Sequence, residues 1–165
     1  MRVLLAFALL LLATPIGAAN WWDEGPPLPR LSGRVVDGAD LLSPAQEKDL
    51  STRLARLEAA TGHQFVIATI SDLQGQKIEQ FGVRLGRTWG IGRKGIDDGV
   101  LLIVAPNDRK VRIEVGYGLE KALSDPICAQ IIREKIMPPI GRGDISGGIR
   151  AGAAAILSIL GHKPS

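Results

Sequence analysis

Two short apolar runs indicate buried strands in this chain. Residues Gln64–Ile70 and Val100–Val104 are rich in β-branched side chains and almost unbroken in apolar character, which is typical of strands covered on both faces. We expect the first run to be central in a sheet. Residues Val111–Val115 alternate apolar and charged side chains, so they are predicted to pair back as a hairpin strand with Val104 opposite Val111.

Four segments have helical periodicity. Ser43-Pro44-Ala45-Gln46 combines a capping box with a proline at the first helical position, and Thr61-Gly62 is predicted to end this helix. A second helix is predicted over residues 78–89 from its apolar spacing. A third is expected from Asp125-Pro126 to Pro138-Pro139, and a last one over residues 145–160.

Strands interleaved with helices predict an α/β fold in a single domain. The strand, helix, strand passage over residues 64–104 is expected to be a right-handed parallel crossover. The hairpin then adds an antiparallel strand, which makes the predicted sheet small and mixed. The sequence has no internal repeat.

A leader and a linker are expected before this domain, which we place at residues 35–162. Residues 1–19 have the layout of a secretory signal peptide, with cleavage expected near Ala19. An uncleaved anchor is the alternative, but the apolar run is only about ten to twelve residues and a spanning helix needs roughly twenty. Residues 20–34 are proline-rich and predicted to be extended, and Trp21 and Trp22 there either bind a partner or pack loosely. We therefore expect a periplasmic or secreted protein.

Composition narrows the chemistry further. The 20 Lys and Arg against 17 Asp and Glu are spread along the 165 residues, which argues against a nucleic-acid partner. An exported protein has no supply of ATP or NAD, so no nucleotide cofactor is expected. The Gly90–Gly95 loop matches G-x-G-x-x-G, but it follows a helix and precedes a strand, the reverse of the dinucleotide-binding context. Cys128 is the single cysteine, so it cannot form an internal disulfide and is expected to be buried. We expect the protein to be a soluble monomer.

Basic residues gather around Trp89. Arg84, Arg87, Arg93 and Lys94 could receive a phosphate group or an acidic partner. The same pattern also fits a solvated helix face, which is the favoured interpretation.

Acidic residues gather at one end of the predicted sheet. Antiparallel pairing across the hairpin brings the residues before Val100 close to those after Val115, so Asp97, Asp98 and Glu120 share this end. Carboxylates and free carbonyls in short loops suit a hard cation such as calcium or magnesium. Alternatively, Asp97 and Asp98 only form a turn and Glu120 is a solvated charge.

Four stretches of the chain together resemble the TPM domain. They are residues 35–43, 89–92, 97–105 and 109–120, the last of which ends in Gly-Tyr-Gly-Leu-Glu. This domain occurs in exported bacterial proteins and in thylakoid-lumen proteins linked to photosystem II repair. The resemblance runs from about Val35 to Leu160. It implies an α/β/α sandwich and, for some relatives, a divalent-cation site and a weak acid phosphatase activity.

The resemblance also implies a ligand set. The acidic positions of the family fall on Asp37, Asp97, Glu114 and Glu120, and Asp98 stands where relatives often carry Asn. The candidate metal ligands are therefore Asp37, Asp97, Asp98, Glu114 and Glu120, with calcium favoured over magnesium. Glu114 could instead pair with the strand neighbours of Arg112 and not join the site.

The expected function is that of an exported TPM-type domain that binds a divalent cation and acts as an accessory or quality-control factor for envelope or membrane proteins. The alternative is a metal-assisted acid phosphatase in which Arg93 or Lys94 balances the charge of the phosphate ester. We identify neither a nucleophile with a positioned acid nor a pair of metal sites in the sequence. No catalytic residue is therefore assigned.

Overall fold

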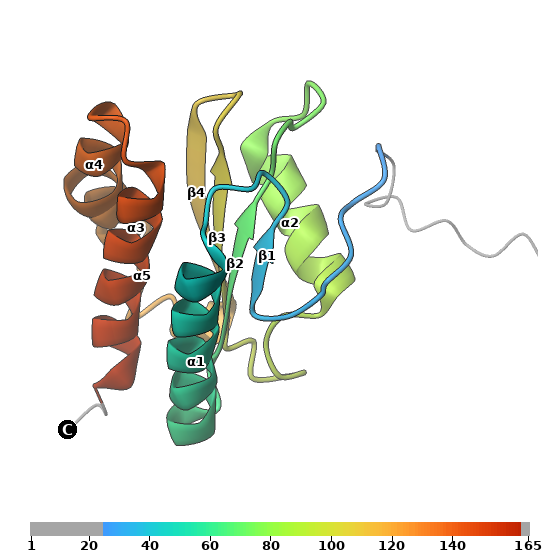
Figure 1. Ribbon diagram of the computed structural model, residues 1–165. Helices are drawn as coiled ribbons and strands as arrows, with labels where there is room; N and C mark the ends of the chain where they lie inside the picture. Colours follow the sequence, from blue (N-terminus) through green and yellow to red (C-terminus); the bar gives the residue numbers. More distant parts are fainter. Residues whose placement is uncertain (1–24, 163–165) are drawn as a thin grey trace, which may run out of the picture.

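The computed structural model describes residues 25–162, which form a four-stranded mixed sheet covered by helices on both faces (Figure 1). The strand order is β1-β2-β3-β4, with bounds β1 Val35–Asp37, β2 Gln64–Thr69, β3 Gly99–Ala105 and β4 Lys110–Val115. The first three strands are parallel, and β4 pairs antiparallel with β3. The predicted α/β/α sandwich and mixed sheet are confirmed.

The helices form two unequal layers (Figure 1). On one face lie α1 Pro44–Thr61, α3 Asp125–Ile131, α4 Met137–Gly141 and α5 Ile145–Gly161, and on the other lies α2 Ile78–Trp89. The larger apolar core joins the first group to the sheet, and a smaller core joins α2 to it. Both cores meet at β2 and β3, which explains why their sequences are apolar on both faces.

The strands and the first helix follow the sequence signals closely. The Ser43 hydroxyl accepts the Gln46 N–H at 3.3 Å, and the Gln46 side chain accepts the Ser43 N–H at 2.8 Å, which is the predicted capping box. Gly62 ends α1 in the left-handed conformation, with φ of 81°, and donates to the Glu58 carbonyl. The hairpin has the predicted register, since Val104 lies opposite Val111.

Two features differ from the sequence predictions. The short strand β1 was not predicted, because three residues carry too little periodicity to mark a strand. The third helix was predicted to stop at Pro138-Pro139, and this was wrong. The chain passes through a π-helical turn, η2 Ile132–Ile136, into α4. Both prolines lie in the first turn of α4, where a backbone N–H has no intrahelical acceptor, so the N–H that proline lacks costs no helical hydrogen bond.

Residues 25–34 pack along α2. Arg84, only 7% exposed, donates to the carbonyl of Pro26 at 2.9 Å, and the indole N–H of Trp89 donates to the carbonyl of Pro29 at 2.9 Å. The favoured interpretation of Arg84 as part of a solvated helix face is therefore wrong, because its guanidinium is buried against this segment. The proposed signal peptide, Trp21 and Trp22 lie outside the described residues.

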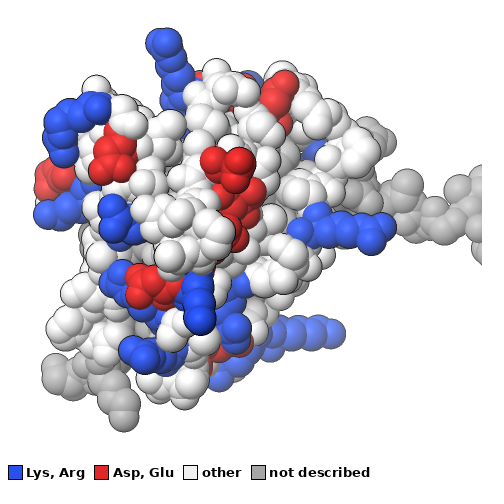
Figure 2. Space-filling model, in the orientation of Figure 1, with Lys and Arg blue, Asp and Glu red and all other residues white. Residues whose placement is uncertain are grey.

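None of the helices within residues 25–162 combines the length and the apolar character that crossing a membrane would require. Charges of both signs are interspersed on the face shown in Figure 2.

Candidate functional site

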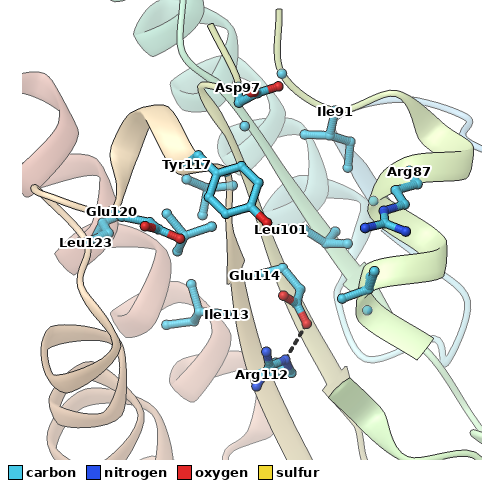
Figure 3. Close-up of a pocket in the computed structure, with 18 of the residues that line it drawn as sticks. Arg87, Ile91, Asp97, Leu101, Arg112, Ile113, Glu114, Tyr117, Glu120 and Leu123 are labelled. Carbon is cyan, nitrogen blue, oxygen red and sulfur yellow. Dashed lines mark hydrogen bonds and ion pairs between the residues drawn. The ribbon is translucent and has the colours of Figure 1, made fainter. Parts of the chain in front are cut away.

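A cavity of about 620 Å³ lies along β4 and opens between α2 and the loops that flank the hairpin (Figure 3). Its walls come from the middle of α2, the loop over residues 90–97, and the segment after β4 that begins with the short turn η1, Tyr117–Leu119. Helix α2 contributes Gly82 and Gly86, whose missing side chains leave room above β4. A volume of this size falls in the range of small-molecule and peptide sites.

Backbone contacts between glycines hold the two loops at the end of this cavity together. Gly116 donates its N–H to the Gly99 carbonyl at 2.8 Å, and Gly118 donates to the Asp97 carbonyl at 3.1 Å. A Cβ atom added at Gly116 would collide with the Asp97 carbonyl. The close approach of these loops therefore depends on glycine, and it fixes Asp97 beside the turn that leads to Glu120.

Asp97 and Glu120 are the two predicted ligands that lie on the two loops at this end of the cavity. Both line the cavity and are exposed (Figure 3). Within residues 25–162, neither carboxylate takes part in a hydrogen bond or an ion pair. Asp97 has a positive φ of 53°, a conformation that aspartate tolerates better than most residues.

Glu114 lies in the middle of the cavity but is already engaged. Its carboxylate accepts a hydrogen bond from Arg112 on the same strand face (Figure 3). It also packs against Gly82, where an added Cβ would lie 2.6 Å from a Glu114 oxygen. The sequence left open that Glu114 pairs with the strand neighbours of Arg112, whereas the structure pairs it with Arg112 itself.

Asp98 points into the protein, away from Asp97. It is 1% exposed and accepts the Arg93 backbone N–H and the Arg93 Nε–H, both at 2.8 Å, with His63 Nδ1 at 3.3 Å. Burial alone would raise the pKa of Asp98, but the hydrogen bonds from Arg93 and His63 and the charge of Arg93 lower it from 3.8 to about 2. The negative charge of Asp98, at a position where relatives often carry Asn, is therefore neutralised by its ion pair with Arg93.

Asp37 lies at the opposite end of the sheet. It pairs with Thr69, which pairs with Val104, whereas Asp97 and Asp98 come before the first residue of β3. Six strand residues at ~3.3 Å each separate the two ends by roughly 20 Å. The Asp37 carboxylate accepts the N–H groups of Leu41 and Leu42 at 3.1 and 2.8 Å, so it holds the turn before α1.

The five predicted ligands therefore do not converge on one point. Among the described residues, no group of three or more His, Cys, Asp or Glu side chains is placed to hold a metal ion. Calcium takes six to eight oxygen ligands. Asp97 and Glu120 can supply part of such a set at the cavity mouth, and Asp37, Asp98 and Glu114 do not complete it in this arrangement.

Basic groups also contribute to the walls of the cavity. Arg87 and Lys94 contribute to its walls, while Arg84 and Arg93 are held elsewhere by Pro26 and Asp98. No Ser, Thr, Cys or His is among the described residues that line it. Burial raises the pKa of the Cys128 thiol to about 11, with a further contribution from Asp125, which agrees with an unreactive, buried cysteine.

Sequence reasoning did not single out two exposed apolar side chains at this site. Tyr117 stands at the cavity mouth (Figure 3) and is 79% exposed. Val83, which lines the cavity from α2, is 39% exposed. Tyr117 carried a usable signal, because a lone aromatic residue between two glycines has little local apolar surface to pack against. Val83 carried none, since one valine on an amphipathic helix is ordinary.

Comparison with known proteins identifies the fold family. The TPM domain model matches residues 35–159. The chain belongs to the TPM domain family. The solution structure of the N-terminal domain of a P. gingivalis protein is 32% identical to it, with a TM-score of 0.74, covering 81% of this chain and 90% of that one.

Two further solution structures share the TPM fold at lower identity. The N-terminal domain of a Corynebacterium glutamicum protein is 15% identical, with a TM-score of 0.61, covering 86% of this chain and 89% of that one. The BA42 protein from the psychrophilic Bizionia argentinensis is 17% identical, with a TM-score of 0.62, covering 73% of this chain and 82% of that one. No match was found among curated proteins.

Proposed function

We propose that this TPM domain works by binding, as an accessory or quality-control factor for exported envelope proteins, and that the cavity along β4 is its binding site. The observation that carries the proposal is the cavity itself, which combines an apolar floor, charged groups of both signs and an exposed aromatic ring. Tyrosine is among the side chains that most often anchor protein interfaces, and Tyr117 lies at the mouth of this cavity. Among the described residues that line the cavity there is no Ser, Thr, Cys or His, which favours binding over catalysis by a hydroxyl or thiol nucleophile activated by a histidine.

The same proposal includes a divalent cation, calcium in preference to magnesium, at Asp97 and Glu120. These are the predicted ligands that remain exposed and unpaired within residues 25–162, and they sit on two loops joined by the hydrogen bond from Gly118 to Asp97. Flexible loop oxygens suit calcium better than the strict octahedron of magnesium. Since two carboxylates supply only part of the shell, we expect weak affinity, of the order of 10⁻³ M.

Calcium titration of the exported protein tests this site. With Kd near 10⁻³ M, a tenfold excess of calcium should stabilise the folded state by about 1.4 kcal/mol, measured as a rise in unfolding temperature. Asp97→Asn and Glu120→Gln should each abolish the rise, because each removes one ligand charge without changing side-chain size.

The matched control is Asp49→Asn on the exposed face of α1, far along the chain from the cavity. It should leave the calcium response unchanged. An equal response in all four proteins would show that calcium acts elsewhere, and no response at 10 mM calcium would remove the cation from the proposal.

The alternative activity is a metal-assisted acid phosphatase. The observation in its favour is that Lys94 lines the same cavity as Asp97 and Glu120, so an ammonium group and a carboxylate-bound cation could face one phosphate ester. It predicts calcium- or magnesium-dependent hydrolysis of p-nitrophenyl phosphate that Asp97→Asn and Lys94→Met both reduce at least tenfold. A rate that is the same in wild type and both variants would point to a contaminating phosphatase.

A further inference from the structure

One edge of the sheet has unpaired backbone groups. The hydrogen bond from Gly116 to Gly99 sets the antiparallel pattern, so Glu114 and Arg112 face β3 with their N–H and C=O groups. The backbone groups of Val111, Ile113 and Val115 then point to the free side of β4. They form no hydrogen bond with any residue in the described part of the chain.

The cavity wraps around this free edge. Its lining includes Arg112 and Glu114, which face α2, and also Ile113 and Val115, which face the larger core. A strand added beside β4 would therefore direct its side chains alternately into the two halves of the cavity. The half on the side of the larger core is lined by Leu123, in the segment after η1.

Exposed apolar groups flank the same edge. Tyr117 at 79%, Ile96 at 49% and Val83 at 39% are among the most exposed large apolar residues of the described chain. Ile96 packs its carbonyl against Gly118 and Val83 lines the cavity wall. Together they offer apolar contacts on both sides of an added strand.

The charged residues that line the cavity indicate which side chains the added strand would carry. Four carboxylates line it, Asp97, Glu114, Glu120 and Asp125, against Arg87, Arg112 and Lys94. Arg112 and Glu114 pair with each other and Arg87 already has a partner, which leaves Asp97, Glu120 and Asp125 against Lys94. Basic side chains in the occupant would therefore be favoured, and Tyr117 offers them a ring face.

We propose that β4 accepts an extended segment of another polypeptide as a fifth strand, and that this segment alternates apolar side chains with Lys or Arg. The inference rests on the proposed binding role and names the partner of the same cavity. Main-chain hydrogen bonds to Val111, Ile113 and Val115 supply affinity, and the two halves of the cavity select the side chains. The ion pair of Arg112 and Glu114 keeps the edge from pairing indiscriminately.

The test uses the exported protein and the probe peptide Ac-Ser-Val-Lys-Val-Lys-Val-Ser-amide. In the free protein, the amides of Val111, Ile113 and Val115 should exchange with solvent faster than those of Arg112 and Glu114. Saturating peptide should slow exchange at these three amides at least tenfold. A peptide N-methylated on alternate residues, which cannot donate to β4, should bind at least tenfold more weakly.

A variant supplies the second measurement. Val115→Pro removes an N–H that points away from β3, so the ladder keeps its bonds while the peptide loses one. Peptide affinity should fall at least tenfold, with the unfolding temperature checked in parallel. Should the variant not fold, the exchange measurement on the wild type still decides the question.

The outcomes separate this inference from the proposed function. Equal binding of the N-methylated peptide, or protection away from β4, would overturn the added strand while leaving a binding role. No binding of the peptide together with a calcium response at Asp97 would overturn the strand alone. Slowed exchange at β4 caused by rising protein concentration, with a doubled mass in light scattering, would replace the partner by a second copy of this chain.

Discussion

Replacing Asp98 with alanine is expected to lower the free energy of unfolding by about 3 kcal/mol. The carboxylate is buried and holds the backbone and side chain of Arg93 together with His63. Hydrogen bonds to a charged group contribute about 1.5–3 kcal/mol, and the alanine leaves the Arg93 backbone N–H without its acceptor. The loop over residues 90–97, which forms one wall of the cavity, loses its main anchor.

Urea unfolding at pH 7 measures this loss, and neighbouring substitutions control for it. Asp98→Asn keeps one acceptor and the size of the side chain, so it should cost less than Asp98→Ala. Asp97→Asn makes the same chemical change one residue earlier, at an exposed and unpaired side chain, and should stay within about 0.5 kcal/mol of the wild type. Equal losses at the two positions would show that Asp98 is not the anchor.

The pH dependence of stability follows from the same contacts. Because the folded-state pKa of Asp98 is lowered from 3.8 to about 2, its contribution is complete above pH 3.8 and is lost as the pH falls toward 2. The shift corresponds to about 2 kcal/mol. The difference in unfolding free energy between wild type and Asp98→Ala should therefore be constant at neutral pH and shrink below pH 4.

The buried strands, the start of the first helix and the hairpin were predictable from local sequence patterns. The strands at residues 64–69 and 99–105 are buried on both faces, so almost every side chain carries the apolar signal. The capping box at Ser43 and the hairpin register are also local, since each depends on residues a few positions apart or on one short turn. The π-helical turn before Pro138 was not predicted, and η2 packs against α5, which follows later in the chain.

The candidate site was predictable only in part, because sequence places acidic residues near one another without saying where each points. Asp97 and Asp98 are adjacent, yet one is exposed and the other is buried against Arg93. A strand period of two does not apply in the loop before β3, so the sequence could not separate them. Asp37 was grouped with them through a family resemblance, while the parallel register puts it at the far end of the sheet.

The free edge of β4 is a property of topology rather than of any residue type. The alternating pattern of residues 111–115 predicts a half-buried hairpin strand, and this holds equally for a central or an edge position. Only the strand order shows that nothing in the described chain pairs beyond β4. Likewise, only the fold shows that Tyr117 lies beside a cavity.

Replacing Gly116 with alanine is expected to destabilise the fold by about 2–3 kcal/mol. The backbone of Gly116 has φ of −70° and ψ of 150°, which alanine adopts easily, so the cost is steric. The added Cβ collides with the Asp97 carbonyl and must push the two loops apart. That movement weakens the hydrogen bonds from Gly116 to Gly99 and from Gly118 to Asp97.

Gly86→Ala is the matched control on the other wall of the same cavity. Gly86 lies inside α2, and nothing within 4 Å would meet its Cβ, so alanine should stabilise the protein by about 0.5–1 kcal/mol. Unfolding in urea therefore gives opposite signs for two identical changes. Because Gly116→Ala also separates Asp97 from the turn before Glu120, it should remove the calcium response, which Gly86→Ala should retain. If Gly116→Ala were as stable as the wild type, the contact between the two loops would not hold this end of the cavity together, and the cation site proposed on Asp97 and Glu120 would lose its structural support.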